Sequence, residues 1–238
     1  MTERAVKKYD YIIIGAGSAG SVLADRLSAD GRSQVLIVES GGMDRSPYIH
    51  LPVGYGRLFY DTRWNYCLNA EPQEALNGRV DYWPRGHVVG GSGSINAMVY
   101  CRGLPGDFDD WRAAGNPGWG WNEVLPRFIR AERNERGADA WHGAEGPLNV
   151  ADLRSPNPFG ALFVEAAQQC GHPHNPDFNA ADPTGVGHYQ VTHRNGERFK
   201  AARAYLDPVR SRPNLSIVTD VRVTRILFED RRAVGVEY

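Results

Sequence analysis

The order of apolar and polar residues predicts a strand, a helix and a second strand at the start of the chain. Residues 9–14 are a short, β-branched apolar run that ends at Gly15, as a buried parallel strand does. Residues 21–29 repeat apolar side chains at the period of a helix, and Gly31 follows as a helix-ending glycine. Residues 34–38 form a second apolar run. We therefore predict a βαβ unit.

The pattern is less regular after this unit. Residues 40–81 are dense in glycine, proline and aromatic residues, which predicts loops with short strands. Periodic apolar positions predict helices at 122–132, within 156–170 and at 201–209. Alternating apolar positions predict strands at 217–223 and 234–238, with a turn at 229–232. Because the sequence stops inside the last of these strands, we expect the chain to be a fragment of a longer protein.

Composition and charge are those of an ordinary globular protein. Of the 238 residues, 42 % are apolar and 23 % are charged, and the formal net charge of −1 offers no general attraction for nucleic acid or an anionic membrane. No apolar stretch approaches the ~20 residues that span a bilayer, so we expect no transmembrane segment. Cys67, Cys101 and Cys170 are widely spaced, which argues against a disulfide framework or a zinc site and for a reducing compartment. The predicted location is the cytoplasm.

A glycine motif joins the first predicted strand to the helix. It reads Gly15-Ala16-Gly17-Ser18-Ala19-Gly20, and an acidic residue, Glu39, follows about 20 positions later at the end of the second strand. In this motif the first glycine permits a tight turn, the second lets the backbone approach a pyrophosphate, and the third lets helix and strand pack closely. The helix N-terminus favours phosphate binding.

The motif predicts a dinucleotide site. The residues expected to bind the pyrophosphate are Gly15, Gly17, Ser18, Ala19 and Gly20. Glu39 is expected to accept hydrogen bonds from ribose hydroxyls, and its charge disfavours the 2′-phosphate of NADP. The motif alone fits FAD and NAD equally, and its alternative interpretation is a glycine turn in some other α/β protein.

A second glycine-rich stretch lies at residues 85–103. It reads Arg-Gly-His-Val-Val-Gly-Gly-Ser-Gly-Ser-Ile-Asn-Ala-Met-Val-Tyr-Cys-Arg-Gly. Consecutive glycines and serines expose backbone N–H groups that can wrap a diphosphate and a flavin ring. The stretch closely resembles the first signature of the glucose-methanol-choline (GMC) oxidoreductases. Further stretches similar to that family lie at 39–42, 107–111, 115–126, 142–148, 201–206, 212–215 and 233–236.

The resemblance implies an α/β fold whose cofactor is FAD rather than NAD. A Rossmann-like FAD-binding domain is expected in discontinuous pieces at 5–45, 80–125 and 197–238. Residues 46–79 are expected to form a lid over the flavin. Residues 145–196 are expected to begin a substrate-binding α+β domain that is truncated here.

The resemblance also implies which residues meet the cofactor. Those expected at the flavin are Val88, Gly91, Ser92, Asn96, Ala97, Met98 and Val99, and the backbone of Val221 is expected at the adenine. Some family members attach FAD covalently through a histidine where this sequence has Ile95, so we expect non-covalent FAD. Other departures from the family pattern are Gly93 for serine, His87 for lysine or arginine, and Lys200 for serine.

The chemistry implied by the resemblance is oxidation of the CH–OH group of a small-molecule alcohol, by hydride transfer to flavin N5. In the family the catalytic histidine and its partner lie in the C-terminal half. No stretch here matches that half, so we assign no catalytic residue. The resemblance specifies neither the alcohol nor the electron acceptor. The alternatives are a non-catalytic FAD-binding fragment and a lyase or photoenzyme on the same scaffold.

The remaining histidines do not suggest a second site. His172 and His174 flank a proline, and a surface loop explains them better than a metal site because no third ligand is placed. We predict no metal.

Overall fold

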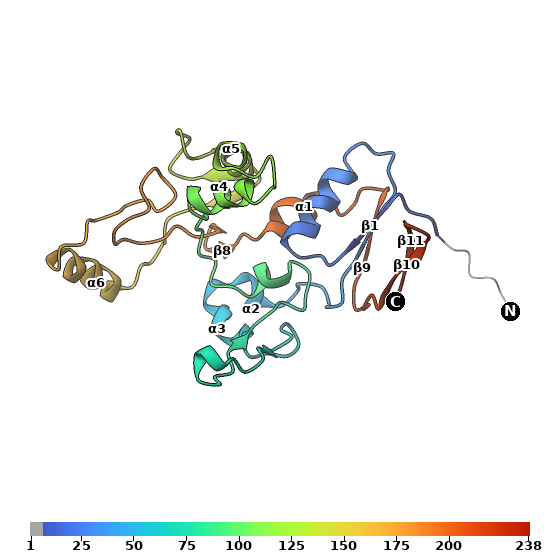
Figure 1. Cartoon of the computed structure of the whole chain (residues 1–238), viewed down its shortest axis with the longest axis horizontal. Helices are drawn as coiled ribbons and strands as arrows, with labels where there is room; N and C mark the ends of the chain where they lie inside the picture. Colours follow the sequence, from blue (N-terminus) through green and yellow to red (C-terminus); the bar gives the residue numbers. More distant parts are fainter. Residues whose placement is uncertain (1–6) are drawn as a thin grey trace. The chain divides into compact units, whose positions relative to one another are not determined.

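A parallel sheet brings together apolar runs from the two ends of the sequence. In the computed structural model, which describes residues 7–238, β1 (Tyr11–Ile14) pairs with β2 (Val35–Val38), and β2 pairs on its other side with β9 (Leu215–Val218). All four residues of β2 are buried, as expected for the central strand. The predicted βαβ start is confirmed (Figure 1). The predicted domain start at residue 5 lies outside the described residues.

Helix α1 (Ser18–Leu27) packs against this sheet, and η4 (Ala202–Leu206), a turn of π-helix, packs beside α1. Helix α1 starts three residues before the predicted segment. Gly31 has a φ of +68° and donates to the carbonyl of Ser28, so it closes the turn after the helix. The buried core between these elements consists of Ile13, Ala16, Ala24, Val35, Ile37, Val89, Ala202, Leu206, Val209 and Leu215.

The chain divides into two units, 7–97 with 200–238, and 98–199. The second unit begins at Met98 because backbone pairing starts there. The Met98 carbonyl accepts from the N–H of Thr192 at 2.9 Å, and Val99 forms a β-bridge with Val191. In this division residues 98–125 lie in the second unit and residues 46–79 in the first.

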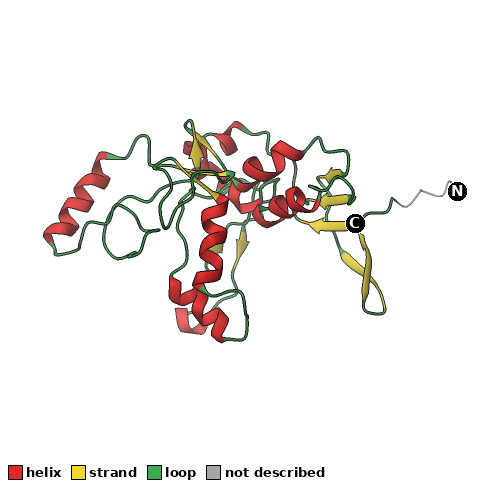
Figure 2. Cartoon of the chain, turned by 90° about the horizontal axis from the view of Figure 1, so that it is seen from above, coloured by secondary structure: helices red, strands yellow, loops and turns green. Residues whose placement is uncertain are grey.

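The first unit otherwise contains short helices and two antiparallel strand pairs. Its further elements are α2 (Pro47–His50), η1 (Pro52–Gly54), α3 (Tyr55–Leu58), β3 (Leu68–Asn69), η2 (Glu74–Leu76), β4 (Tyr82–Trp83), η3 (Gly91–Ser94), η5 (Asp207–Val209), β10 (Arg225–Glu229) and β11 (Arg232–Glu237). A second core cluster joins Ile49 and Leu58 of the short helices to Val88 and Ile95. Figure 2 shows β10 and β11 as a two-stranded ribbon near the C-terminus.

The predicted strand at 217–223 is wrong beyond Val218. Strand β9 ends there because Asp220 adopts a φ of +60°, which turns the chain out of the extended conformation. The N–H of Asp220 then donates to Gly41, and that of Val221 donates to Glu39. These bonds bring residues 220–221 to the end of β2.

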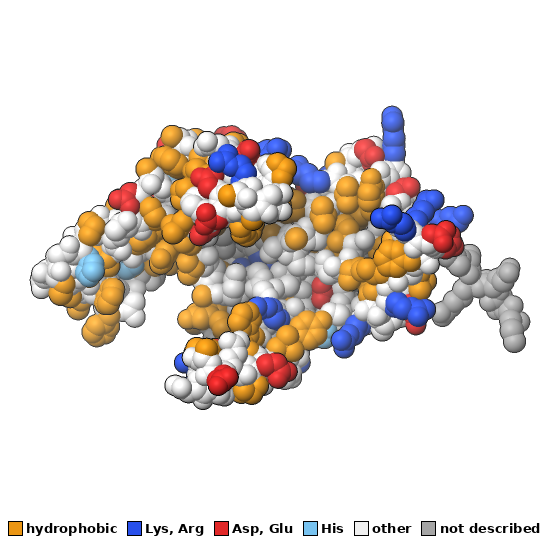
Figure 3. Space-filling model, in the orientation of Figure 1, with side chains coloured by type: hydrophobic (Ala, Val, Ile, Leu, Met, Phe, Trp, Pro, Cys, Tyr) orange, Lys and Arg blue, Asp and Glu red, His pale blue; other side chains and the backbone are white. Residues whose placement is uncertain are grey.

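The second unit contains three helices and short strands. These are α4 (Pro105–Ala113), α5 (Trp121–Ala131), β5 (Glu132–Asn134), β6 (Leu148–Val150), α6 (Pro158–Gln169), β7 (His193–Arg194) and β8 (Glu197–Arg198). Helices α5 and α6 confirm the predicted segments, whereas α4 was not predicted. The apolar stripe of α6 is exposed, with Phe159 at 78 % and Phe163 at 69 % relative exposure, and hydrophobic side chains gather over this helix in Figure 3. No helix within residues 7–238 has the length and apolar character needed to cross a membrane.

Candidate functional site

The first glycine loop turns the chain from β1 into α1. Gly15 has a φ of +95°, where a side chain is strained, and its N–H donates to Val38 of β2 at 2.7 Å. A Cβ at Gly20 would lie 2.0 Å from the carbonyl oxygen of Gly15 and 3.3 Å from Ile13 of β1. Only glycine therefore fits at this contact between helix and strand. Gly17 precedes the first turn of α1, which carries no acidic side chain to repel an anion.

Glu39 holds two loops together at the end of β2. Its Oε2 accepts from the N–H of Ala16 at 2.8 Å, and its Oε1 accepts from the N–H of Gly41 at 2.9 Å. Ser40 also donates to Oε1, at 3.3 Å. Since a carboxylate offers about four acceptor positions, Glu39 retains capacity for a further donor such as a ribose hydroxyl.

The second glycine loop lies directly against the first. The N–H of Gly90 donates to the carbonyl of Ala16 at 2.8 Å. Gly91 has a φ of +56°, and a Cβ there would lie 2.9 Å from Cα of Gly17. A Cβ at Gly93 would lie 3.2 Å from Oγ of Ser18. The two glycine stretches, far apart in sequence, thus form one backbone surface.

These loops border a cavity of about 420 Å³ within the first unit. It is lined by Ile14, Gly15, Gly17, Val38, Glu39, Ser40, Tyr66, Arg85, Gly86, Gly91, Ser92, Val221, Arg222 and Val223. This volume is in the range of about 300–1,000 Å³ found for small-molecule sites. Glycine backbone on one wall, an acidic side chain at a strand end and two arginines fit part of a dinucleotide, with its phosphates and ribose hydroxyls.

Six of the predicted site residues line this cavity: Gly15, Gly17, Glu39, Gly91, Ser92 and Val221. The others lie elsewhere. Ser18 and Ala19 are exposed in the first turn of α1, Gly20 is buried beneath it, and Asn96 and Ala97 are exposed after η3. Val88 is fully buried in the second core cluster. Met98 and Val99 belong to the second unit, where Met98 is buried with a φ of +64°.

Several cavity residues were missed in the sequence. Tyr66 comes from a segment without periodicity, and no local pattern marks it. Arg85 begins the second glycine-rich stretch but was not assigned to the site. The hydroxyl of Tyr66 is hydrogen-bonded to Ser40, and its ring lies 4.4 Å from that of His87 between centroids. The sequence could have indicated three other cavity residues, because each is the last residue of a predicted strand. They are Ile14, Val38 and Val223. Position 86 accepts only glycine, because a Cβ there would lie 2.1 Å from the carbonyl oxygen of Gly91.

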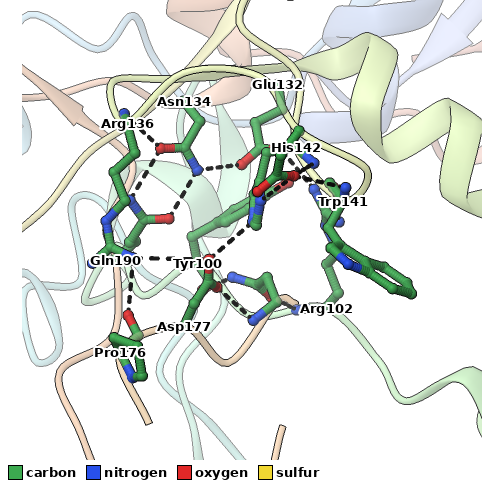
Figure 4. Close-up of polar contacts among 12 residues, drawn as sticks. Tyr100, Arg102, Glu132, Asn134, Arg136, Trp141, His142, Pro176, Asp177 and Gln190 are labelled. Atoms are coloured by element: carbon green, nitrogen blue, oxygen red, sulfur yellow. Dashed lines mark hydrogen bonds and ion pairs between the residues drawn. The ribbon is translucent and has the colours of Figure 1, made fainter. Parts of the chain in front are cut away.

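A separate polar network lies inside the second unit (Figure 4). The side chains of Arg102 and Glu132 form an ion pair and are 3 % and 0 % exposed. Arg102 also donates to the carbonyl of Trp141 at 2.6 Å, and Glu132 accepts from Asn134 at 2.9 Å. Asn134 in turn bonds to Gln190. Within residues 7–238 no group of three or more His, Cys, Asp or Glu side chains is arranged to hold a metal.

Comparisons with known proteins agree with the two glycine loops. The family model described as GMC oxidoreductase matches residues 9–238. The chain is 48 % identical to an alcohol dehydrogenase (acceptor) of Pseudomonas putida, over 97 % of this chain and 42 % of that protein. It is 44 % identical to the mitochondrial choline dehydrogenase of Homo sapiens, over 97 % of this chain and 40 % of that protein. The chain thus spans well under half the length of these curated relatives.

Solved structures show the same fold. A pyridoxine 4-oxidase from Mesorbium loti superposes with a TM-score of 0.90 at 37 % identity, covering 96 % of this chain and 45 % of that one. An FAD-dependent oxidoreductase from Chaetomium thermophilum superposes with a TM-score of 0.87 at 35 % identity, covering 96 % and 41 %. The fold class is therefore α/β, as predicted. The chain belongs to the GMC oxidoreductase family.

Proposed function

We propose that this chain is the FAD-binding part of an FAD-dependent oxidoreductase that acts on the CH–OH group of a small-molecule alcohol. The observation that carries the proposal is the contact between Gly91 and Gly17, which places both glycine loops at one cavity with Glu39 at its edge. The names of the relatives, alcohol dehydrogenase and choline dehydrogenase, support the class of substrate.

In this proposal the bound flavin supplies the acceptor for a hydride from the alcohol carbon. The chain's own residues bind and orient it. The N–H groups of the glycine loops and the N-terminus of α1 bind the diphosphate, Glu39 binds ribose hydroxyls, and the backbone of Val221 meets the adenine. The further contacts proposed for Val88, Asn96, Ala97, Met98 and Val99 are with the flavin. The catalytic pair belongs to a part of the protein that this chain does not contain.

We propose that the FAD is held without a covalent bond. Ile95 offers no nucleophile and is 2 % exposed, packed with Ile49, Leu58 and Val88.

The domain organisation that we propose follows from the assignment of the chain as an FAD-binding part. Residues 46–79 form the flavin lid, 145–196 begin the substrate-binding domain, and the discontinuous pieces around them form a Rossmann-like FAD-binding domain. The proposed compartment is the cytoplasm, because Cys67, Cys101 and Cys170 are all free and two of them are exposed.

The testing experiment is a visible absorbance spectrum of the purified chain, before and after acid denaturation. A flavin spectrum with FAD released into the supernatant is expected. Flavin that stays with the precipitate would overturn non-covalent binding. An alcohol screen with an artificial electron acceptor then compares this chain with a full-length version. Activity in the full-length version alone supports the oxidoreductase, and bound FAD without turnover of any alcohol in either form favours a non-catalytic or lyase use of the scaffold.

A further inference from the structure

A buried lysine lies beneath the second glycine loop. The side chain of Lys200, just before η4, is 3 % exposed. Its Nζ lies 2.6 Å from Oγ of Ser94 and 3.3 Å from the carbonyl oxygen of Val89. Val89 and Ser94 stand at the two ends of the turn that contains Gly91 and Ser92. One ammonium group therefore spans the base of the loop whose middle lines the cavity.

The lysine charge is compensated within the same unit. Oδ2 of Asp44 lies 2.8 Å from Nζ of Lys200, and the Asp44 side chain is 9 % exposed. Arg210 approaches the other oxygen of Asp44 at 3.3 Å. A buried cation is tolerated when it is paired and hydrogen-bonded in this way. Asp44 follows β2 in sequence, so the pair also fixes the loop to the end of the sheet.

The conformation of the loop depends on this packing. Gly90 has a φ of +94°, and a Cβ there would lie 2.3 Å from Oγ of Ser94 and 2.9 Å from Cδ of Lys200. The hydroxyl of Ser94 also donates to the carbonyl of Val89 at 2.7 Å. The lysine stem and the serine hydroxyl thus occupy the inside of the bend, and Gly91 and Ser92 line the cavity.

We infer that Lys200 is a positioning residue for the cofactor: it holds residues 89–94 in the conformation in which their backbone meets the FAD diphosphate. The inference rests on the proposed function, since it concerns how the proposed FAD site is shaped. Lys200 itself does not line the cavity and acts through the loop.

The test is FAD binding to the apo form of the full chain, with the wild type and three variants. Lys200→Met removes the ammonium group and keeps the stem. Ser94→Ala removes one loop-side partner of Lys200 together with the bond from Ser94 to Val89, and leaves the Val89 carbonyl and the Lys200–Asp44 pair. Arg210→Met is the matched control, because it removes a cation from the same Asp44 without touching the loop. The FAD dissociation constant and the melting temperature are measured for each, together with the ³¹P resonances of bound FAD.

Lys200→Met is expected to raise the dissociation constant about tenfold or more, as loss of hydrogen bonds to a charged group implies. Ser94→Ala is expected to raise it several-fold with little change in melting temperature, and both variants are expected to shift the ³¹P resonances. Arg210→Met is expected to lower the melting temperature and leave the dissociation constant within about twofold.

Three results would overturn the inference, and the third is distinguishable from the other two. Unchanged affinity and ³¹P resonances in Ser94→Ala, or equal losses of affinity in Lys200→Met and Arg210→Met, would reduce Lys200 to a general stabilising residue. A wild-type chain that takes up no FAD would instead overturn the proposed function, and the inference with it.

Discussion

The Oε2 atom of Glu39 accepts a buried hydrogen bond from the backbone N–H of Ala16 at 2.8 Å. The same carboxylate binds the N–H of Gly41. Glu39 therefore shapes the cavity before any ligand arrives, in addition to the contact with ribose that we propose for it.

Replacing Glu39 by alanine should destabilise the apo chain as well as weaken FAD binding. Two buried N–H groups lose their acceptor, at a cost of about 1–3 kcal/mol each. Urea unfolding of the apo form measures this directly. An apo stability equal to that of the wild type would show that the carboxylate serves only the ligand.

Gly20→Ala should destabilise the first unit, because the added Cβ meets the backbone oxygen of Gly15 at 2.0 Å. A loss of about 1–3 kcal/mol or more is expected for such overpacking. Gly56→Ala is the matched control, since it lies in α3 with open space around its Cβ position. It should be neutral or stabilising by up to about 1 kcal/mol. Thermal unfolding compares the two, and equal melting temperatures would contradict the prediction.

Gly91→Ala should abolish or strongly weaken FAD binding. Its Cβ would press on Cα of Gly17 at 2.9 Å and separate the two glycine loops. Gly78→Ala shares the backbone strain, at a φ of +73°, but has open space around it. Strain of about 1–2 kcal/mol is common to both variants, so the difference in FAD affinity isolates the contact between loops. Fluorescence titration with FAD provides the measurement. Similar affinities in the two variants would show that the loops need not touch.

Asp44 should make stability depend on pH in the acid range. Burial raises the pKa of Asp44, but Lys200 and Arg210 more than offset this, so that the pKa lies below its ordinary value. The stabilisation is present above the unfolded-state pKa of about 3.9 and is lost as the pH falls through the lower folded-state pKa. Asp44→Asn should thus be less stable than the wild type at pH 7, with a gap that narrows below about pH 4. Urea unfolding across this range tests the sign, and a constant gap would refute it.

In the second unit, Arg102→Met should be costly because it leaves the fully buried Glu132 without its partner. About 3–5 kcal/mol is typical for breaking such a pair from one side. The double variant Arg102→Met with Glu132→Gln should recover part of the loss, since the uncompensated charge is gone. Chemical denaturation of the three proteins gives the comparison. A double variant less stable than Arg102→Met would argue against charge as the cause.

The sequence predicted a helix or strand correctly where the pattern of apolar residues lies within that element. The order of apolar positions predicted β1, β2, α1, α5 and α6, because the signal lies in residues that are close in sequence. The stripe of α6 follows the helical period although it is exposed. Helix α4 escaped detection since it has no buried residue and begins Pro-Gly-Asp-Phe-Asp-Asp, which carries no apolar period. The end of β9 was misjudged because the left-handed conformation of Asp220 depends on its bond to Gly41.

The site residues likewise differ in whether a local sequence pattern could indicate them. Gly15, Gly17 and Glu39 have the spacing of a dinucleotide motif, and they line the cavity. Tyr66 reaches the cavity only through tertiary packing, so no spacing could indicate it. The structural bonds of Glu39 were also invisible, because its partners are backbone groups that every residue possesses.

The third strand of the sheet comes from the far end of the chain, and this sets the course of folding. Asn214, next to β9, donates to the carbonyl of Ser28 across a separation of 186 residues. Such pairings have high contact order and form slowly, because a long loop must close before they gain any stability. On the ribosome, β1, α1 and β2 emerge first but wait for β9, while residues 98–199 emerge in full and can fold in the interval. The sheet that borders the dinucleotide cavity is therefore complete only after β9, which follows the whole of the inserted unit in sequence, has left the ribosome.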